Sequence, residues 1–142
     1  MVVAAYGKTL KEKIMCGEQK FYICKHCGNL IGLIENKGVP LVCCGQNMTR
    51  LVANTVEASV EKHLPAVTVS KDGLRVDVGS VLHPMAQEHH ITFVYVETQN
   101  GGQRKCLKIG ATPSVTFSFS DDKPVAVYAY CNLHGLWKTE IN

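Results

Sequence analysis

Residues 124–137 decide the fold, and they read Pro124-Val-Ala-Val-Tyr-Ala-Tyr-Cys131-Asn-Leu-His134-Gly-Leu-Trp137. The first part alternates between two faces of an extended chain, with Val125, Val127, Ala129 and Cys131 on one face and Ala126, Tyr128 and Tyr130 on the other. Successive side chains of a β-strand point to opposite sides, so this period of two predicts a strand that ends at Cys131.

The same period of two recurs upstream, in segments that are separated by turn signals. We expect strands over residues 65–70, 74–78, 91–98 and 115–120. The turn signals are Asn100-Gly101-Gly102 and Asp121-Asp-Lys-Pro124. No long segment has a helical period. About six or seven short strands at close intervals predict a mainly β chain, folded as a sandwich or a barrel.

Composition excludes several classes of protein. The chain has 142 residues, of which 46% are hydrophobic and 19% charged, as in an ordinary globular protein. Its net charge of +3 is too small to indicate a nucleic-acid or anionic-membrane partner. We see neither a membrane-spanning apolar run nor a secretory signal, and therefore expect a cytoplasmic protein.

Seven cysteines and six histidines are the unusual part of the composition. Cytoplasmic thiols are kept reduced, so clustered cysteines there indicate a metal site or a catalytic group rather than disulfides. An odd number of cysteines also cannot be fully paired within one chain. The arrangement of cysteines and histidines along the chain therefore leads the functional analysis.

Three regions differ in pattern. Residues 1–19 are weakly patterned and are treated as an N-terminal extension. Residues 20–55 hold four cysteines and many breakers, namely Gly28, Gly32, Gly38, Pro40 and Gly45. A segment this short cannot build a stable apolar core, and it requires a metal or a partner surface. Residues 56–142 form the β-rich region.

The first candidate metal site combines Cys24-Lys-His-Cys27 with Cys43-Cys44. Two pairs of thiolates can hold one ion tetrahedrally, which suits zinc or a single iron, and ligand type alone leaves both open. Gly28 permits the tight turn after the first pair. Adjacent Cys43 and Cys44 can bind one ion only through a locally distorted backbone.

The second candidate site is spread over the β-rich region and comprises His63, His83, His89, Cys131 and His134. Any one of these histidines, taken alone, is more often a core or surface residue than a ligand. His83 and His89 bracket a turn, and Cys131 and His134 form a C-x-x-H pair. Such positions lie at strand ends, where loops can converge at one end of a sandwich.

Four motifs together resemble those of desulfoferrodoxin, the two-iron form of superoxide reductase. They are C-x-x-C with C-C over residues 24–44, Glu61-Lys-His-x-Pro65, His83-Pro-Met with His89 six residues on, and Tyr130-Cys-Asn-Leu-His-Gly-x-Trp137. They occur in the family's order and near its spacings, over about residues 20–140.

The resemblance implies a small desulforedoxin-like domain with an Fe(Cys)4 site, over residues 20–55. It implies an immunoglobulin-like, seven-stranded β-sandwich over residues 56–142, with a second iron. The implied ligands are four equatorial histidines and one axial cysteine: His63, His83, His89, His134 and Cys131. The expected cofactors are two iron ions per chain, without haem or flavin.

The resemblance also implies roles for two neighbours of His63. Lys62 would attract superoxide and assist protonation of the product, and Glu61 would be a sixth ligand to the oxidised iron. The Fe(Cys)4 site would be an electron relay or an accessory site. The expected partners are superoxide, a rubredoxin or reductase as electron donor, and a second copy in a homodimer.

Two other classes of protein remain as alternatives. One is a rubredoxin-like electron-transfer protein without superoxide chemistry, and the other is a zinc ribbon attached to an interaction domain. A blue-copper site uses two histidines and one cysteine as ligands, which is fewer than the four histidines and one cysteine found here. Four residues have no expected metal role: His26, His90, Cys16 and Cys106. His90 offers a second imidazole beside His89, and the six-residue interval from His83 favours His89.

Overall fold

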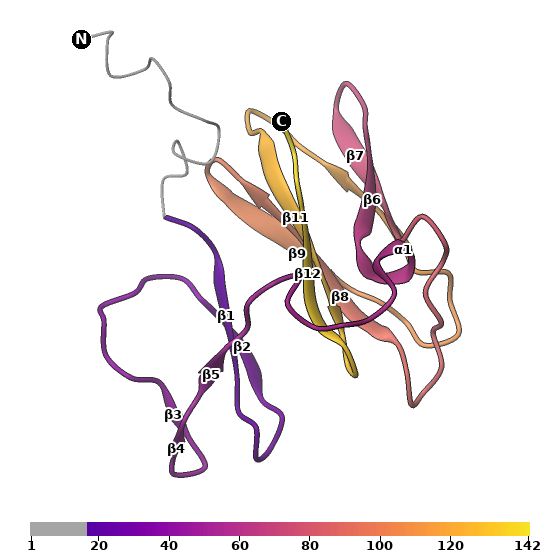
Figure 1. Ribbon diagram of the computed structural model, residues 1–142. Helices are drawn as coiled ribbons and strands as arrows, with labels where there is room; N and C mark the ends of the chain where they lie inside the picture. Colours follow the sequence, from indigo (N-terminus) through magenta and orange to yellow (C-terminus); the bar gives the residue numbers. More distant parts are fainter. Residues whose placement is uncertain (1–16) are drawn as a thin grey trace, which may run out of the picture.

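The structure is a computed structural model that describes residues 17–142 (Figure 1). Most of the expected N-terminal extension, including Cys16, lies outside the described residues. The described chain is mainly β, with a small unit of short strands followed by a larger sandwich. This agrees with the fold class expected from the sequence.

The sandwich contains a three-stranded and a four-stranded antiparallel sheet. The first has the order β10-β7-β6, formed by Ser114–Ser118, Gly73–Val78 and Pro65–Val69. The second has the order β12-β11-β8-β9, formed by Gly135–Glu140, Pro124–Cys131, Ile91–Thr98 and Gly101–Cys106. The predicted seven-stranded sandwich is therefore confirmed.

The four strands upstream of residue 124 that alternation predicted are all present, with ends shifted by one or two residues. Alternation did not single out β9, because this edge strand is largely exposed along its length and reads Gly-Gly-Gln-Arg-Lys-Cys. A one-turn helix, α1 (Val60–His63), precedes β6. Among the described residues, no helix has the length and apolar character needed to cross a bilayer.

The two faces predicted for residues 125–131 lie in two different hydrophobic cores. Val127, Ala129 and Cys131 face the space between the sheets, together with residues such as Val76 and Val94. Ala126 and Tyr128 face outward, but the small N-terminal unit covers them. The four-stranded sheet is therefore buried on both faces, and Figure 1 shows the small unit beside it.

The small unit contains a sheet of order β2-β1-β5 and a separate two-stranded hairpin of β3 and β4. The bounds are Lys20–Ile23 for β1, Leu30–Leu33 for β2, Val42–Cys43 for β3, Gln46–Asn47 for β4 and Thr49–Arg50 for β5. Phe21 of β1 joins the unit to the sandwich, because its ring lies 5.5 Å from Phe93 and 5.5 Å from Tyr128.

Substitution of Phe21 tests this interface. Phe21→Ala should lower the free energy of unfolding by about 3 kcal/mol, because it removes a buried ring between two units. Urea unfolding measures the change. Val69→Ala is the control, since Val69 is exposed on β6 and its truncation should change stability by less than about 0.5 kcal/mol. Equal effects of the two substitutions would contradict the proposed role of Phe21.

Candidate metal centres

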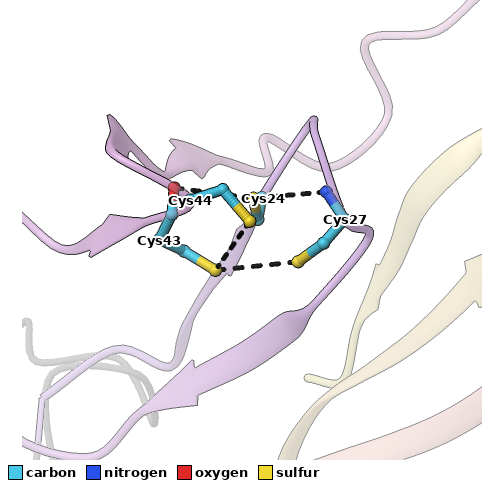
Figure 2. Close-up of side chains that lie close together, drawn as sticks. All are labelled: Cys24, Cys27, Cys43 and Cys44. Carbon is cyan, nitrogen blue, oxygen red and sulfur yellow. Dashed lines mark hydrogen bonds between the residues drawn. The ribbon is translucent and has the colours of Figure 1, made fainter.

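Cys24, Cys27, Cys43 and Cys44 gather their sulfur atoms in the small unit, all within 4.8 Å of one another. Cys24 and Cys27 come from the turn after β1, and Cys43 and Cys44 come from the facing hairpin (Figure 2). The sulfur atoms of Cys27 and Cys43 are 3.6 Å apart, and those of Cys43 and Cys44 are 3.9 Å apart.

These separations fit one shared ion and exclude disulfides. A disulfide requires about 2.05 Å between its sulfur atoms. A tetrahedral site with metal–sulfur bonds of about 2.3 Å has sulfur atoms about 3.8 Å apart. The observed distances of 3.6 and 3.9 Å lie on either side of that value. The small unit therefore has a donor set suited to a closed metal site.

The backbone of the hairpin is distorted at the adjacent cysteines, as the sequence analysis predicted. Cys44 has a φ of 53°, in the left-handed region that non-glycine residues rarely adopt. Gly45 continues the turn with a φ of 71°, and Gly28 has a φ of 87° after the first pair. The left-handed residue allows two neighbouring side chains to face the same point.

Backbone amides prepare the cysteines for ionisation. The Cys27 N–H donates to the Cys24 sulfur at 3.5 Å, which is the main cause that lowers the pKa of Cys24 to about 6. The thiol groups of Cys27 and Cys24 raise the pKa of Cys44 to about 12. One thiolate forms readily and further ones repel it, so a bound cation is needed to ionise all four.

The second group of side chains lies at one end of the sandwich. His63 ends α1, His83 follows β7, and His89 precedes β8. Cys131 ends β11, and His134 lies in the turn to β12. Gly79 allows α1 to approach closely, because a Cβ atom there would lie 2.6 Å from the carbonyl oxygen of Glu61.

The four imidazoles form a closed ring of neighbours in the order 63, 83, 89, 134. Neighbouring ring centroids are 4.5 Å, 4.5 Å, 5.1 Å and 4.9 Å apart, whereas His63 and His89, on opposite sides, are 6.3 Å apart. Neighbouring ring planes cross at 75–88°. Ligand atoms of His63, His89, Cys131 and His134 all lie within 4.8 Å of one another.

His83 lies outside that compact group but contacts two of its members. Its Nε2 is 3.1 Å from the Nε2 of His63 and 3.4 Å from the sulfur of Cys131. The same sulfur is 3.9 Å from Nδ1 of His134, on the opposite side of the ring. The Cys131 sulfur therefore lies near the centre of the circle of four imidazoles rather than at its edge.

The contact between His63 and His83 cannot be an ordinary hydrogen bond. Each Nδ1 lies 2.7 Å from a backbone carbonyl, that of Ser59 or Pro84, and must carry a proton to donate to it. Burial lowers the pKa of both imidazoles, that of His83 to about 4, so both are neutral at pH 7. The two Nε2 lone pairs consequently cannot bond to each other, and each lies near a further group of the site, the Nδ1 of His134 at 3.1 Å from His63 and the Cys131 sulfur at 3.4 Å from His83.

His89 adds an unpaired nitrogen to this site. Its Nε2 is buried and has no hydrogen-bond partner among the described residues. Burial also lowers the pKa of His89. Buried polar atoms are usually satisfied, so this unpaired nitrogen beside two facing Nε2 lone pairs indicates a cation that would accept them. Imidazole and thiolate donors together suit iron, copper or zinc.

Cys131 is fully buried, and this raises the pKa of its thiol. The backbone N–H groups of Leu133 and His134 donate to its sulfur and act in the opposite direction. A cation is therefore needed to ionise this thiol at pH 7, whereas the amides stabilise the resulting thiolate.

Lys62 and Glu61 stand next to His63 on α1, and both are exposed. Burial is the main cause that lowers the pKa of His63 and of His89, and the charge of Lys62 is a smaller cause for both. The Lys62 ammonium therefore acts on this site. Glu61 is not among the clustered ligand atoms. Its carbonyl instead accepts the N–H of Val81 at 2.9 Å, which fixes α1 to the following loop.

Three residues without an expected metal role lie outside both groups of ligand atoms: His26, His90 and Cys106. His26 and Cys106 are exposed. The Nδ1 of His90 donates to the carbonyl of Ala86 at 3.0 Å, away from the ring of imidazoles. The structure therefore brings His89, and not His90, to the second group.

Sequence reasoning missed the contribution of Trp137. Its ring stacks on His63 at 5.0 Å, and its Nε1 donates to the carbonyl of His134 at 3.1 Å. One side chain thus orients two candidate ligands. The signal was present, because Trp137 is the last residue of the motif that contains Cys131 and His134.

Fold and sites together define a β-sandwich protein with two candidate metal centres, one of thiolates alone and one of imidazoles and a thiolate. A sequence model described as Desulfoferrodoxin matches residues 55–140. The desulfoferrodoxin of Nitratidesulfovibrio vulgaris is 39% identical over 126 residues, covering 89% of this chain and 99% of that protein. The chain belongs to the desulfoferrodoxin family.

Solved structures and shorter relatives agree with this assignment. The crystal structure of the superoxide reductase from Treponema pallidum is similar with a TM-score of 0.74 and 33% identity, covering 87% of this chain and 98% of that one. The superoxide reductase of Pyrococcus horikoshii is 30% identical over 99 residues, covering 57% of this chain and 86% of that protein.

The lowered histidine pKa values predict how the metal-free chain responds to acid. Between about pH 6.5 and pH 4 the unfolded chain binds a proton at His83 that the folded chain does not bind. The free energy of unfolding should therefore fall as the pH falls through this window, by about 3 kcal/mol for this group. Urea unfolding of metal-depleted protein at several pH values measures it.

Two variants separate this effect from general acid sensitivity. His83→Asn should flatten the dependence on pH, because it removes the group that titrates. His26→Asn should leave it unchanged, since His26 is exposed and outside both sites. Equal slopes for all three chains would show that burial of His83 does not contribute.

Proposed function

We propose that the chain is a superoxide reductase, which adds one electron and two protons to superoxide and releases hydrogen peroxide. The reactive iron would be held by His63, His83, His89, His134 and Cys131. The observation that supports this most strongly is the pair of deprotonated Nε2 atoms of His63 and His83, 3.1 Å apart beside a buried thiol.

Five protein donors leave one coordination position open, which is how a catalytic metal site differs from a structural one. When bound, ferrous iron supplies the electron to superoxide at that position. Cys131 lies near the centre of the four imidazoles, and its thiolate would hold the iron and donate electron density to it. The amides of Leu133 and His134 would moderate that donation.

Lys62 would attract the superoxide anion and assist protonation of the product through water. The influence of its charge on the pKa of His63 and His89 supports this role. Glu61 is proposed as a ligand that occupies the open position after turnover. Its place on α1, two residues before His63, and its exposed side chain support this proposal.

The site of four cysteines is proposed to hold iron and to act as an electron relay or an accessory site. Four thiolates fill the tetrahedron and leave no position for substrate. Rubredoxin or a reductase is the proposed donor, and reoxidation of the reduced donor on mixing with the oxidised chain would test this. Absence of any reoxidation would refute it.

A homodimer and a cytoplasmic location are also proposed. The small unit exposes Ile34, Val39 and Val42, which are 84%, 70% and 64% exposed, and association would cover such side chains. Sedimentation at micromolar concentration tests the dimer, and a monomer would refute it. A reducing compartment suits six free cysteines among the described residues, and cell fractionation tests the location.

The activity is tested by metal analysis combined with a superoxide assay in the presence of a reductant. Two iron atoms per chain and hydrogen peroxide without oxygen evolution are expected. Superoxide that persists would favour a rubredoxin-like electron-transfer protein. Oxygen evolution would indicate dismutation instead, and zinc in both sites would contradict the proposal.

A matched pair of cysteine variants separates the two sites. Cys131→Ser should abolish superoxide reduction, because it removes the one thiolate that lies among the four imidazoles. Cys24→Ser should retain much of the activity, since that sulfur belongs to the closed site. Stopped-flow consumption of superoxide measures both. Loss of activity in Cys24→Ser alone would reverse the assigned roles.

Removal of one cation tests electrostatic attraction. Lys62→Ala should slow the reaction with superoxide about tenfold at low salt and flatten its dependence on ionic strength. Lys71→Ala is the control, because Lys71 is exposed beyond the opposite end of β6 from α1. An unchanged rate in Lys62→Ala, measured by pulse radiolysis, would make Lys62 an ordinary surface lysine.

A further inference from the structure

The side chain of Asn132 joins two loops that carry candidate ligands. Its Oδ1 accepts the N–H of His90 at 2.8 Å, and its Nδ2 donates to the carbonyl of Glu88 at 3.0 Å. The backbone N–H of Asn132 also donates to the carbonyl of His90 at 3.2 Å. These three bonds flank His89 on both sides and come from the residue directly after Cys131.

The loop between β7 and β8 ends where Ile91 pairs with Cys131 in the sheet, two residues after His89, and it has other hydrogen bonds of its own. Ala86 and His89 exchange backbone bonds of 2.9 and 3.2 Å, which set the shape of the loop itself. The carbonyl of Met85 accepts the N–H of Gly110 at 2.8 Å, in the middle of the loop. Beyond the strand pair, the side chain of Asn132 joins residues 88 and 90 to the turn after Cys131.

The His89 ring depends on this backbone connection more than the rings of His63 and His83 do. The rings of His63 and His83 are each anchored by an Nδ1–H that donates to a carbonyl at 2.7 Å. Among residues 17–142, the His89 ring has no comparable anchor, and its buried Nε2 has no partner. The position of this imidazole is consequently set by the backbone on either side of it.

We propose that Asn132 is a positioning residue: it holds the imidazole of His89 at its place among the four imidazoles around Cys131. The inference rests on the metal site proposed above, but neither on the identity of the metal nor on superoxide as substrate. A side-chain amide of this length offers an acceptor and a donor together. Leucine has the same shape and offers neither.

The experiment is a titration of the metal-depleted full chain with Co²⁺, in competition with a chromophoric chelator. Asn132→Leu should weaken binding at the imidazole site about tenfold, in the range typical for loss of a residue that orients a ligand. Cys131→Ser identifies which of the two binding steps belongs to that site. Binding at the site of four cysteines should be unchanged in Asn132→Leu.

Asn54→Gly is the matched control. The Asn54 amide also bridges backbone groups, accepting the Lys138 N–H at 2.9 Å and donating to the Lys138 carbonyl at 3.1 Å. Its φ of 62° suits glycine, so the variant loses the two bonds without backbone strain. It should bind Co²⁺ at the imidazole site as the unsubstituted chain does. An equal loss in both variants would reduce Asn132 to a general structural role.

Amide hydrogen exchange in the unsubstituted, metal-free chain provides a test that needs no variant. The His90 N–H should exchange slowly, because it donates to Asn132, whereas the exposed Gln87 N–H should exchange fast. Fast exchange at His90 would overturn the proposal, as would full Co²⁺ affinity in Asn132→Leu. If Asn132→Leu loses affinity while the iron-loaded unsubstituted chain consumes no superoxide, the positioning role stands and the proposed activity fails.

Discussion

Two buried nitrogen atoms that both carry lone pairs, 3.1 Å apart, are the constraint on which this end of the molecule depends. Each belongs to an imidazole whose proton is committed to a backbone carbonyl on its far side. Burial keeps both rings neutral at pH 7, so no proton can bridge them. The surrounding elements hold the two rings in this arrangement, and a shared cation would accept both lone pairs.

Burial of the four-stranded sheet on both faces explains how the elements hold that arrangement. The inward side chains of β11 pack between the sheets, and its outward side chains pack under Phe21 and the small unit. A strand fixed on both faces places its last residue, Cys131, with little freedom. The small unit therefore contributes to the second site through packing, even though its own four thiolates lie in a separate cluster.

The sequence predicted the strands that alternate and the candidate ligands, because both leave a local signal. It did not single out β9, whose exposed residues lack alternation at the sheet edge. It also could not give the order of the imidazoles or the carbonyl partners of His63 and His83, which depend on contacts between distant segments. Choosing His89 over His90 required a spacing taken from a family resemblance, and the ring of neighbours supplies the physical reason.

The four imidazoles form two pairs, and the structure fixes the position of each pair in a different way. His63 and His83 are oriented by their own rings, because the Nδ1–H of each ring donates a hydrogen bond to a backbone carbonyl. His89 and His134 are held through the backbone, with Asn132 bonded around one and Trp137 bonded to the carbonyl of the other. Both Asn132 and Trp137 belong to the segment that carries Cys131. The Cys131 sulfur and the supports of two imidazoles thus belong to one continuous segment, which runs from the end of β11 through the turn into β12.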